Sequence, residues 1–516
     1  MTKSNRTTLL RGARVLQGKG LVDEGGRHDV LIRGDRIESI VPAGSSVMAD
    51  EVVDLEGHIL CPGLINGHQH SHEHFQRGRS ENLPLELWMN LVRTRTPVTL
   101  TPQQIYLRTM IGAIESIRSG CTTLVDDLAV GPALDEERLD AVLQAYEDSG
   151  VRALVGFSMM DKPVVDSFPF VEDAFDAELL SELRSARRPA SDDYLDLITR
   201  RVKAGHHPKE SRVALLLAPS APQRCSQDFL LRIRQMADEY DLPVITHVQE
   251  TRLQVVTGEL LYGMPMVEYL ASIGFLKPST SLIHAVWLNP REIDLLAEHG
   301  ATAQHNPWSN LLLGSGIQPV RELLKAGVNV SLGSDGSCST VTSNMLNVLG
   351  TAAGISKLRG HDPGRWLSAR EALVAATQGG AKALGFGDSL GVIEPGARAD
   401  LFACRIDTIA FTPLSNPIRQ LVYAERGAGV AFSMVDGRIV MHAGRLAQIN
   451  EAKILSEIER EYQLLVSQFD QAEHEMRPVL NAVEKIYKRS LRCTIGPDTF
   501  PARVDTTDDS RYLGLE

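Results

Sequence analysis

Pro62-Gly63-Leu64-Ile65-Asn66-Gly67-His68-Gln69-His70 is the stretch from which the fold and the site of this chain can be predicted. Apolar residues in and just before it predict a buried strand, and two histidines follow at positions i and i+2. Side chains two residues apart on a strand point to the same face, so both imidazoles would project into one space. Neutral imidazole is the commonest side-chain metal ligand. Two histidines at this spacing also occur on ordinary surfaces, so the motif needs partners elsewhere in the chain.

The composition excludes several functional classes. The chain has 516 residues, of which 43% are hydrophobic and 23% are charged, as expected of a soluble globular protein. Its net charge of −12 argues against nucleic acid or an anionic membrane surface as a partner. Residues 1–12 lack the apolar core of a signal peptide, and no run of about 18 apolar residues predicts a membrane span. Six cysteines occur singly, which favours a reduced, cytoplasmic setting.

The two ends of the chain share one pattern. Residues 8–60 and 399–446 alternate short β-type runs with turns such as Arg33-Gly34-Asp35. Neither segment has enough strands for a stable sheet of its own. We therefore predict one composite β-sandwich domain, built from residues 1–61 and 389–448.

The central residues, 62–388, predict an α/β fold. Their β-type runs alternate with amphipathic segments at 104–119, 136–149, 227–240 and 290–299. Together with the opening strand these runs make eight β/α units, the number in a (β/α)8 TIM-type barrel, whose site lies at the carboxyl ends of the strands. The seven later runs are 122–125, 153–157, 213–217, 244–247, 281–284, 301–305 and 328–332.

Two segments do not fit the barrel plan. Residues 158–205 form a connection so long that we expect a functional role, as a flap over the site. Residues 449–516 predict a helical C-terminal extension, with one or two exposed or oligomer-forming helices over 449–489 and an irregular tail from Cys493.

The ends of three later strands carry polar residues that complete the opening motif. His247, His284 and Asp335 each fall on the last residue of an apolar run or just beyond it. A lone histidine at a strand end is more often a hydrogen-bonded core group. With His68 and His70 there are five such residues, each at the end of a predicted barrel strand. Their side chains would meet at one end of the barrel and offer nitrogen and oxygen ligands suited to zinc or ferrous iron.

With these motifs the chain resembles the amidohydrolase superfamily, and within it the branch of metal-dependent aminohydrolases that includes guanine and cytosine deaminases, S-adenosylhomocysteine deaminases and triazine hydrolases. The resemblance covers roughly residues 8–448. The motifs that carry it are Pro62–His70 with Arg77-Gly78, His247-x-x-Glu250-Thr251, His284, His305-Asn306-Pro307-x-Ser309-Asn310, Gly333-Ser334-Asp335-Gly336 and Leu390-Gly391 through Ala399-Asp400-Leu401.

The resemblance implies a metal site and roles for the residues around it. His68, His70, His247 and Asp335 would bind one divalent metal, with Zn²⁺ expected and Fe²⁺ the alternative. Binuclear relatives use a modified lysine at the end of the fourth strand, and residues 215–222 contain no lysine, so we expect a mononuclear site.

Catalytic roles follow from the same resemblance. A bound metal lowers the pKa of water toward 7. Asp335 would accept the proton of that water, His284 would orient the water, and Glu250 would donate a proton to a ring nitrogen of the substrate. The alternative for Glu250 is a carboxylate that stabilises a helix N-terminus.

Substrate contacts are expected from Trp88, Gln249, His305 and Ser220. Trp88 could stack on a heterocycle or belong to the core. Ser220 stands where S-adenosylhomocysteine deaminases carry a histidine, and Trp287 where many relatives carry another. These two departures predict a flatter, more apolar pocket and disfavour a nucleoside substrate. His72 and His74 are expected to be polar loop residues, with substrate contact as the alternative.

The predicted function is metal-dependent deamination of an amino-substituted nitrogen heterocycle of purine, pyrimidine, pterin or triazine type. One alternative is hydrolysis of a C–Cl, amide or cyclic amide bond on the same scaffold. A non-catalytic, metal-retaining barrel is disfavoured by the presence of Glu250 and His284. A nucleic-acid-directed deaminase conflicts with the acidic balance and with the absence of its H-x-E and P-C-x-x-C motifs. The expected partners are a small-molecule heterocycle and further copies of the chain, as a dimer or higher homo-oligomer.

Overall fold

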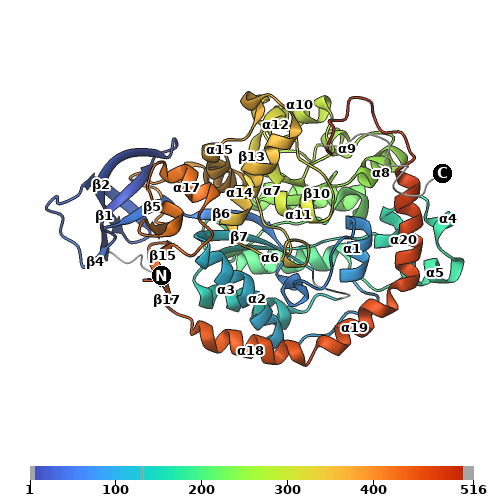
Figure 1. The fold of residues 1–516 in the computed structure, drawn as a ribbon. Helices are drawn as coiled ribbons and strands as arrows, with labels where there is room; N and C mark the ends of the chain where they lie inside the picture. Colours follow the sequence, from blue (N-terminus) through green and yellow to red (C-terminus); the bar gives the residue numbers. More distant parts are fainter. Residues whose placement is uncertain (1–5, 130, 132, 504–516) are drawn as a thin grey trace.

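The structure, a computed structural model, describes residues 6–129, 131 and 133–503. It has a large α/β part and a smaller β-sheet at one end of it (Figure 1). The predicted extension beyond Arg503 lies outside the described residues. The predicted boundaries at 61, 388 and 448 stay predictions.

Eight parallel strands form the centre of the large part. They hydrogen-bond as two four-stranded sheets, one from β6 to β9 and one from β10 to β13. A parallel bridge between Leu217 and Val244 joins the two sheets on one side. On the other side the Asp335 N–H donates to the His68 carbonyl at 2.9 Å. These contacts close the ring and confirm the predicted (β/α)8 barrel.

The strands of the barrel match the predicted runs closely. Their bounds are β6 Leu64–Gln69, β7 Cys121–Leu128, β8 Arg152–Phe157, β9 Val213–Leu215, β10 Val244–Val248, β11 Thr280–His284, β12 Thr302–His305 and β13 Asn329–Leu332.

The helices around the barrel begin at residues suited to helix N-termini. Thr101 accepts a hydrogen bond from the Gln104 N–H and Asn289 accepts one from the Glu292 N–H, each as part of a capping box that pairs the first turn. The main helices are α2 Pro102–Arg118, α3 Glu136–Ser149, α6 Ser191–Lys203, α7 Gln227–Tyr240, α8 Arg252–Tyr262, α9 Met266–Ser272, α10 Pro290–His299, α11 Pro307–Leu312, α12 Val320–Lys325, α14 Met345–Ile355, α15 Ala369–Val374 and α17 Pro417–Tyr423.

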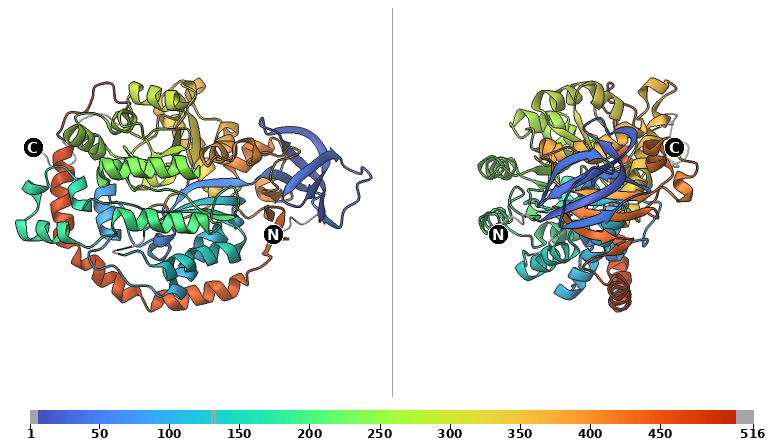
Figure 2. Two further views of the ribbon diagram at one scale, coloured as in Figure 1. Left: turned by 180° about the vertical axis from the view of Figure 1, so that it is seen from behind. Right: turned by 90° about the vertical axis from the view of Figure 1, so that its left-hand side faces the viewer.

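Both ends of the chain contribute to the smaller sheet, as predicted. Strand β5 pairs antiparallel with β14, so that Leu60 lies opposite Ala403, and strands from both ends lie side by side in Figure 2. Gly12 interrupts the pairing of β1, whose first half pairs with β4 and whose second half pairs with β5. The nine strands are β1 Thr7–Gln17, β2 Val22–Arg33, β3 Arg36–Pro42, β4 Glu51–Asp54, β5 His58–Pro62, β14 Leu401–Arg405, β15 Val430–Val435, β16 Arg438–His442 and β17 Arg445–Leu446.

Two glycines of the opening stretch allow close packing, one where the smaller sheet joins the barrel and one inside the barrel. A Cβ atom on Gly63, between β5 and β6, would lie 2.0 Å from Thr122 Oγ1. A Cβ atom on Gly67 would lie 2.3 Å from Gln304 Oε1, inside the barrel. Any larger residue at either position would force neighbouring groups to move.

A separate apolar cluster covers the end of the barrel away from the smaller sheet. It joins α1 Leu85–Val92, the 158–185 part of the long connection, Leu253 of α8 and the C-terminal helix α20 Arg477–Ser490. The long connection contains η2 Val164–Ser167, α4 Val171–Ala174 and α5 Ala177–Ser185. Its packing there agrees with the flap that we predicted.

The C-terminal extension has three helices rather than one or two. Helices α18 Glu451–Gln463 and α19 Val466–Glu475 run along the barrel, and α20 crosses the end that carries α1 (Figures 1 and 2). Helix α20 is not simply exposed, because it buries Val479, Ala482, Val483 and Ile486 against its own chain. No helix within the described residues is long and apolar enough to cross a membrane.

The barrel and the smaller sheet are joined by a buried ion-pair network. Arg152, at the start of β8, is 1% exposed and donates to both carboxylate oxygens of Asp400 at 3.1 Å and to Asp436 at 2.8 Å. Asp400 and Asp436 both belong to the smaller sheet or its turns. Removing one partner of a buried ion pair leaves the other charge uncompensated.

We predict that Arg152→Met lowers the free energy of unfolding by about 3–5 kcal/mol, because the buried Asp400 loses its counter-charge. Asp436 is only partly buried and keeps its ion pair with Arg398. The matched control is Arg291→Met, whose guanidinium pairs with Glu298 on the surface, where solvent screening leaves the pair little effect on stability. Urea unfolding of both variants measures the difference. Similar losses in the two variants would contradict the role given to the network.

Candidate functional site

Five predicted residues come together at the carboxyl ends of the barrel strands. His68 lies on β6, His70 directly follows it, His247 lies on β10, His284 ends β11 and Asp335 follows β13. Asp335 Oδ1 is 3.4 Å from the Nε2 atoms of both His68 and His70. The His247 ring lies 4.9 Å from the His68 ring and 5.5 Å from the His284 ring. All five side chains are buried.

The hydrogen bonds of the histidines leave nitrogen lone pairs directed into this cluster. His70 Nδ1 donates to the Asp127 carbonyl at 2.7 Å, and His247 Nδ1 donates to the Ser220 carbonyl at 2.8 Å. Their Nε2 atoms are therefore unprotonated in the neutral rings, which is the arrangement of metal-ligating histidines.

His68 has no such partner. It is fully buried, and neither of its ring nitrogens makes a hydrogen bond to another described residue. Buried polar atoms without partners cost free energy. A divalent cation among His68, His70, His247 and Asp335 would take the lone pair of one of these nitrogens, so the donor set fits the expected metal.

The protonation states in the cluster suit a cation. Burial lowers the pKa of His68 and His247, and it lowers that of His70 to about 3, with the neighbouring His68 adding to the shift. Burial alone would raise the pKa of Asp335, but its contacts with His68 and His284 hold that pKa well below the ordinary value. The cluster therefore presents neutral imidazoles and an ionised carboxylate, the forms that bind metals.

Glu250 lies beside the cluster as a carboxyl group able to hold a proton near neutral pH. Its Oε2 is 3.4 Å from His284 Nε2, and burial raises its pKa to about 7. His284 Nδ1 donates to Asn310 Oδ1 at 2.9 Å, which turns Nε2 toward Glu250 and Asp335. Ser315 Oγ donates to the other carboxyl oxygen, Oε1, at 3.2 Å.

The backbone is strained where these side chains are held. Gln249, His284, Ala285 and Asp335 have φ values of 48°, 69°, 45° and 69°, which non-glycine residues rarely adopt. Such conformations cost about 1–3 kcal/mol each and are found where the surrounding structure holds them in place. For His284, the Gln318 side chain donates to the backbone carbonyl at 2.6 Å.

Two of the four predicted substrate residues have their polar atoms engaged within the protein. Gln249 donates to the Trp287 carbonyl at 2.5 Å and to Glu292 at 3.1 Å, and its side-chain oxygen accepts from the Met266 N–H at 3.0 Å. Ser220 Oγ accepts from Arg224 at 3.0 Å. These contacts hold the Gln249 side chain in place, and the Ser220 carbonyl positions His247. Contact of either side chain with a substrate stays a prediction.

The other two predicted substrate residues remain candidates. His305, at the end of β12, is buried, and its Nδ1 has no hydrogen-bond partner among the described residues. Trp88, on α1, is buried in the apolar cluster over the barrel end, which also contains Cys338. Trp88 is therefore a core residue of this cluster, and its stacking on a substrate stays a prediction.

Two acidic or polar residues near the cluster were not predicted. Asp127, at the end of β7, forms a potential ligand group with His68, His70 and His247, and burial raises its pKa to about 8. Asp127 follows the predicted β-type run 122–125 closely, and this position at a strand end could have indicated that its side chain lies near the site. Ser315 lies in a loop without any motif, so nothing in the sequence pointed to its contact with Glu250.

His72 and Glu73 form a second potential ligand group with His70, but the hydrogen bonding of His72 argues against a cation there. His72 Nδ1 accepts from the Ala129 N–H at 3.2 Å, so the neutral ring carries its proton on Nε2, the atom nearest Glu73. That nitrogen has no lone pair to offer.

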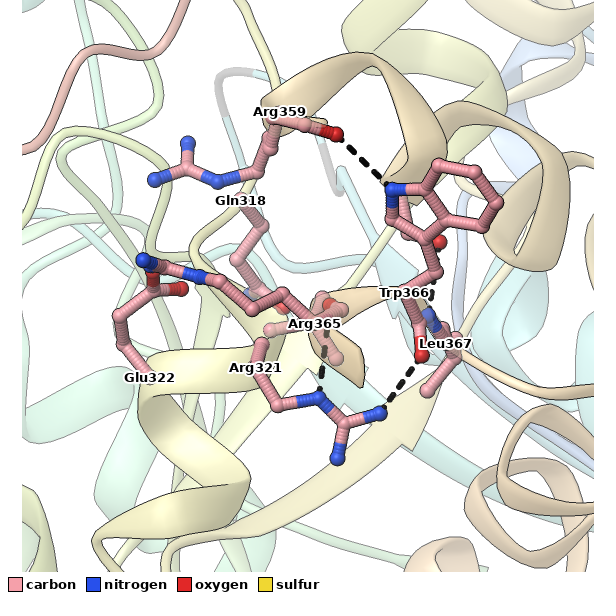
Figure 3. Close-up of a pocket in the computed structure, with 10 residues that line it drawn as sticks. Gln318, Arg321, Glu322, Arg359, Arg365, Trp366 and Leu367 are labelled. Atoms are coloured by element: carbon pink, nitrogen blue, oxygen red, sulfur yellow. Dashed lines mark hydrogen bonds and ion pairs between the residues drawn. The ribbon is translucent and has the colours of Figure 1, made fainter. Parts of the chain in front are cut away.

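A shallow hollow shown in Figure 3 reaches the cluster only through Gln318, whose side chain donates to the His284 carbonyl. Its lining includes Gln318, Arg321, Arg359, Arg365 and Trp366. Arg321 pairs with Glu371 and Arg365 pairs with Glu322. None of the cluster residues lines it, so we do not identify it as the catalytic site.

The sequence pattern of the amidohydrolase family matches residues 59–440. A 5'-deoxyadenosine deaminase of Methanothermobacter thermautotrophicus is 34% identical over 451 residues, which are 87% of this chain and 97% of that protein. A 5-methylthioadenosine/S-adenosylhomocysteine deaminase of Thermococcus kodakarensis is also 34% identical, over 84% of this chain and 93% of that protein.

Two solved structures have the same fold. Atrazine chlorohydrolase from Arthrobacter aurescens, in complex with zinc, superposes with a TM-score of 0.80 at 27% identity, over 88% of this chain and 100% of that chain. An adenosine deaminase from Xanthomonas campestris with bound zinc superposes with a TM-score of 0.77 at 26% identity, over 89% of this chain and 98% of that chain.

The contact between Gln249 and Glu292 leads to a prediction for the pH dependence of stability. Burial raises the pKa of Glu292 from 4.5 to about 8, so between these values the folded protein keeps a proton that the unfolded chain has lost. Stability should therefore fall as pH rises from about 5 to 8, by at most about 1.4 kcal/mol per pH unit. Glu292→Gln removes this proton and should flatten the dependence. Urea unfolding at several pH values tests this, and equal slopes for both proteins would contradict it.

Proposed function

Since this chain belongs to the amidohydrolase family, we propose that it is a metal-dependent aminohydrolase that replaces the exocyclic amino group of a nitrogen heterocycle with hydroxyl. The observation that carries the proposal is the buried group of His68, His70 and His247, with the Asp335 carboxylate 3.4 Å from two of these rings. Beside it lies Glu250, a carboxyl group with a pKa of about 7. The deaminases at 34% identity support the same reaction class.

We assign one divalent cation, Zn²⁺ rather than Fe²⁺, to His68, His70, His247 and Asp335. Three imidazole nitrogens and a carboxylate oxygen are typical zinc donors, and two structural neighbours are zinc complexes. When bound, such a cation lowers the pKa of a water molecule toward 7 and polarises it for attack. Residues 215–222, at the end of β9, contain no lysine to bridge a second metal.

Three residues of the chain then carry out the proton transfers and orient the water. Asp335 accepts a proton from the attacking water, and His284, held by Asn310, orients that water through Nε2. Glu250 donates its proton to the ring nitrogen next to the attacked carbon. The resulting tetrahedral carbon carries both hydroxyl and amino groups. Proton transfer from Asp335 to the amino group expels ammonia, and Glu250 takes back one proton from the ring nitrogen or the new hydroxyl. This leaves the neutral hydroxyl or oxo product and restores both carboxyl groups to their starting states.

For the substrate we propose an aminated purine or a related heterocycle. The names of the relatives point to adenine-containing substrates. Ser220 in place of a histidine and Trp287 in place of another favour a smaller, less polar compound than a nucleoside. Because a structural neighbour is a chlorohydrolase, hydrolysis of a C–Cl bond on the same scaffold is the second candidate.

We further propose a cytoplasmic protein that forms a dimer or higher homo-oligomer. All six cysteines are free, which suits a reducing compartment. Light scattering on the purified protein measures the number of subunits.

The reaction is tested by ammonia release from adenine, adenosine, 5'-deoxyadenosine, aminopyrimidines, pterins and aminotriazines, with chloride release from chlorotriazines measured in parallel. We expect ammonia from at least one compound. Glu250→Gln should lower kcat by about 10²–10⁴-fold because the proton donor is lost. Glu259→Gln, at an exposed position of α8, the helix that follows Glu250, is the control and should keep wild-type kcat. Chloride release without ammonia release would select the second candidate.

The metal assignment is tested with His68→Asn and His72→Asn. The one polar contact of the His68 side chain among the described residues is with Asp335 at 3.4 Å, so its replacement should act mainly through the ligand group. Loss of a residue that merely supports a ligand weakens metal binding about 10–100-fold, and loss of His68 should cost at least as much. In His72→Asn the new side chain can still accept from Ala129, and metal content should stay at one per chain. Equal metal content in both variants, measured by elemental analysis, would refute the assignment.

A further inference from the structure

The last described residues, 491–503, form a tail that lies on the loops around Glu250. After α20 the chain turns back across the barrel end (Figure 1). Arg252, two residues beyond Glu250, donates to the carbonyls of Ser490 and Cys493. The Phe500 N–H donates to the Leu288 carbonyl at 2.8 Å, in the loop after β11. The family match ends at residue 440, so this tail lies outside the matched region.

The tail is fastened most closely to the loop 314–317. The Ile317 N–H donates to the Ala502 carbonyl at 2.6 Å. Ala502 is buried, and a Cβ atom on Gly316 would lie only 2.8 Å from the Ala502 carbonyl oxygen. Arg503 donates to the Gly314 carbonyl. Tail and loop therefore pack against each other without room for an extra methyl group.

Arg359 links the two segments from the side. One nitrogen of its guanidinium, Nη1, donates to the Ile317 carbonyl at 2.7 Å and to the Pro501 carbonyl at 2.8 Å. Arg359 and Gln318 both line the hollow of Figure 3. A single side chain thus holds the tail and the loop together.

The loop in turn contacts Glu250 through Ser315. Ser315 Oγ donates to Glu250 Oε1, and the Ser315 carbonyl accepts from Trp287 Nε1 at 2.8 Å. An oxygen that accepts this hydrogen bond is the unprotonated oxygen of a carboxylic acid. The proton of Glu250 is therefore left on Oε2, the oxygen that faces His284.

We propose that the C-terminal tail 491–503 and Arg359 are positioning elements for proton transfer by Glu250: they hold the 314–317 loop so that Ser315 keeps the proton on Oε2, directed into the site. The inference rests on the proposed function, in which Glu250 donates a proton to the substrate. None of these residues touches the reacting atoms, and their effect passes through the side chain of Ser315.

The test compares Arg359→Met with Arg365→Met in the full chain. Both residues line the same hollow, but Arg365 pairs with Glu322 and makes no contact with the tail. We expect Arg359→Met to lower kcat for ammonia release about 3–30-fold, a part of what general acid catalysis contributes, with KM within twofold and metal content unchanged. Arg365→Met should keep wild-type kcat. A fall in KM or metal content without a fall in kcat would overturn the proposal.

A double-mutant cycle distinguishes an effect of Arg359 that passes through Ser315 from an effect on the loop as a whole. If Arg359 acts through Ser315, the variant Arg359→Met/Ser315→Ala should have the same kcat as Ser315→Ala alone, whereas independent effects would multiply. Because Ser315 donates to the carboxylate, its loss should also move the alkaline limb of the kcat–pH profile to higher pH. Multiplying effects, or an unmoved limb in both single variants, would count against the proposal.

Hydrogen–deuterium exchange gives a readout that needs no turnover. Peptides covering 312–318 should exchange faster in Arg359→Met than in Arg365→Met. If Arg359→Met does not fold, Ala502→Leu crowds Gly316 from the tail side and serves in its place. If the wild-type protein releases ammonia from none of the compounds, the proposed function fails, and equal exchange in the two arginine variants would then overturn the tail assignment independently.

Discussion

One backbone hydrogen bond, from the Asp335 N–H to the His68 carbonyl, joins the first and last strands of the barrel. The ring of parallel strands closes there, and the same contact brings the Asp335 carboxylate within 3.4 Å of two histidines. Asn66 supports the junction, because its side-chain oxygen accepts from the Ser334 N–H at 2.9 Å. Closing the fold and assembling the ligand group are therefore one structural event. The glycines of the same stretch allow it, since Gly63 and Gly67 leave room for Thr122 and Gln304.

A site of this kind costs free energy, and the rest of the molecule offsets that cost. Buried imidazoles, raised carboxyl pKa values and four non-glycine residues with positive φ gather within a few residues of the strand ends. The barrel core and the smaller sheet supply rigid packing beneath the site, joined by Arg152. Above it, α1, the long connection and α20 form an apolar cluster that covers the end of the barrel. This cover also excludes water, which strengthens the electrostatic interactions inside.

The proposed substrate residues show where sequence reasoning reaches its limit. Gln249 and Ser220 occupy the expected positions at strand ends, but their polar atoms are used by Trp287, Glu292 and Arg224. A sequence position at the end of a barrel strand predicts where the backbone lies. It does not predict whether the side chain already has hydrogen-bond partners within the protein. The contribution of Ser220 is its carbonyl, which holds His247, and any residue at that position has a carbonyl.

The sequence by itself determined the periodic features of this protein: eight β/α units, the meeting of both chain ends in one sheet, and the histidines and aspartate that share a mouth. These follow from spacing along single strands and from the rule that parallel strands end on one side. Only the tertiary structure decided the roles of Asp127 and Ser315 and the path of the tail. Those contacts join residues far apart in the chain, such as Ile317 and Ala502. Local periodicity carries no information about them, because their geometry exists only after the loops have packed against one another.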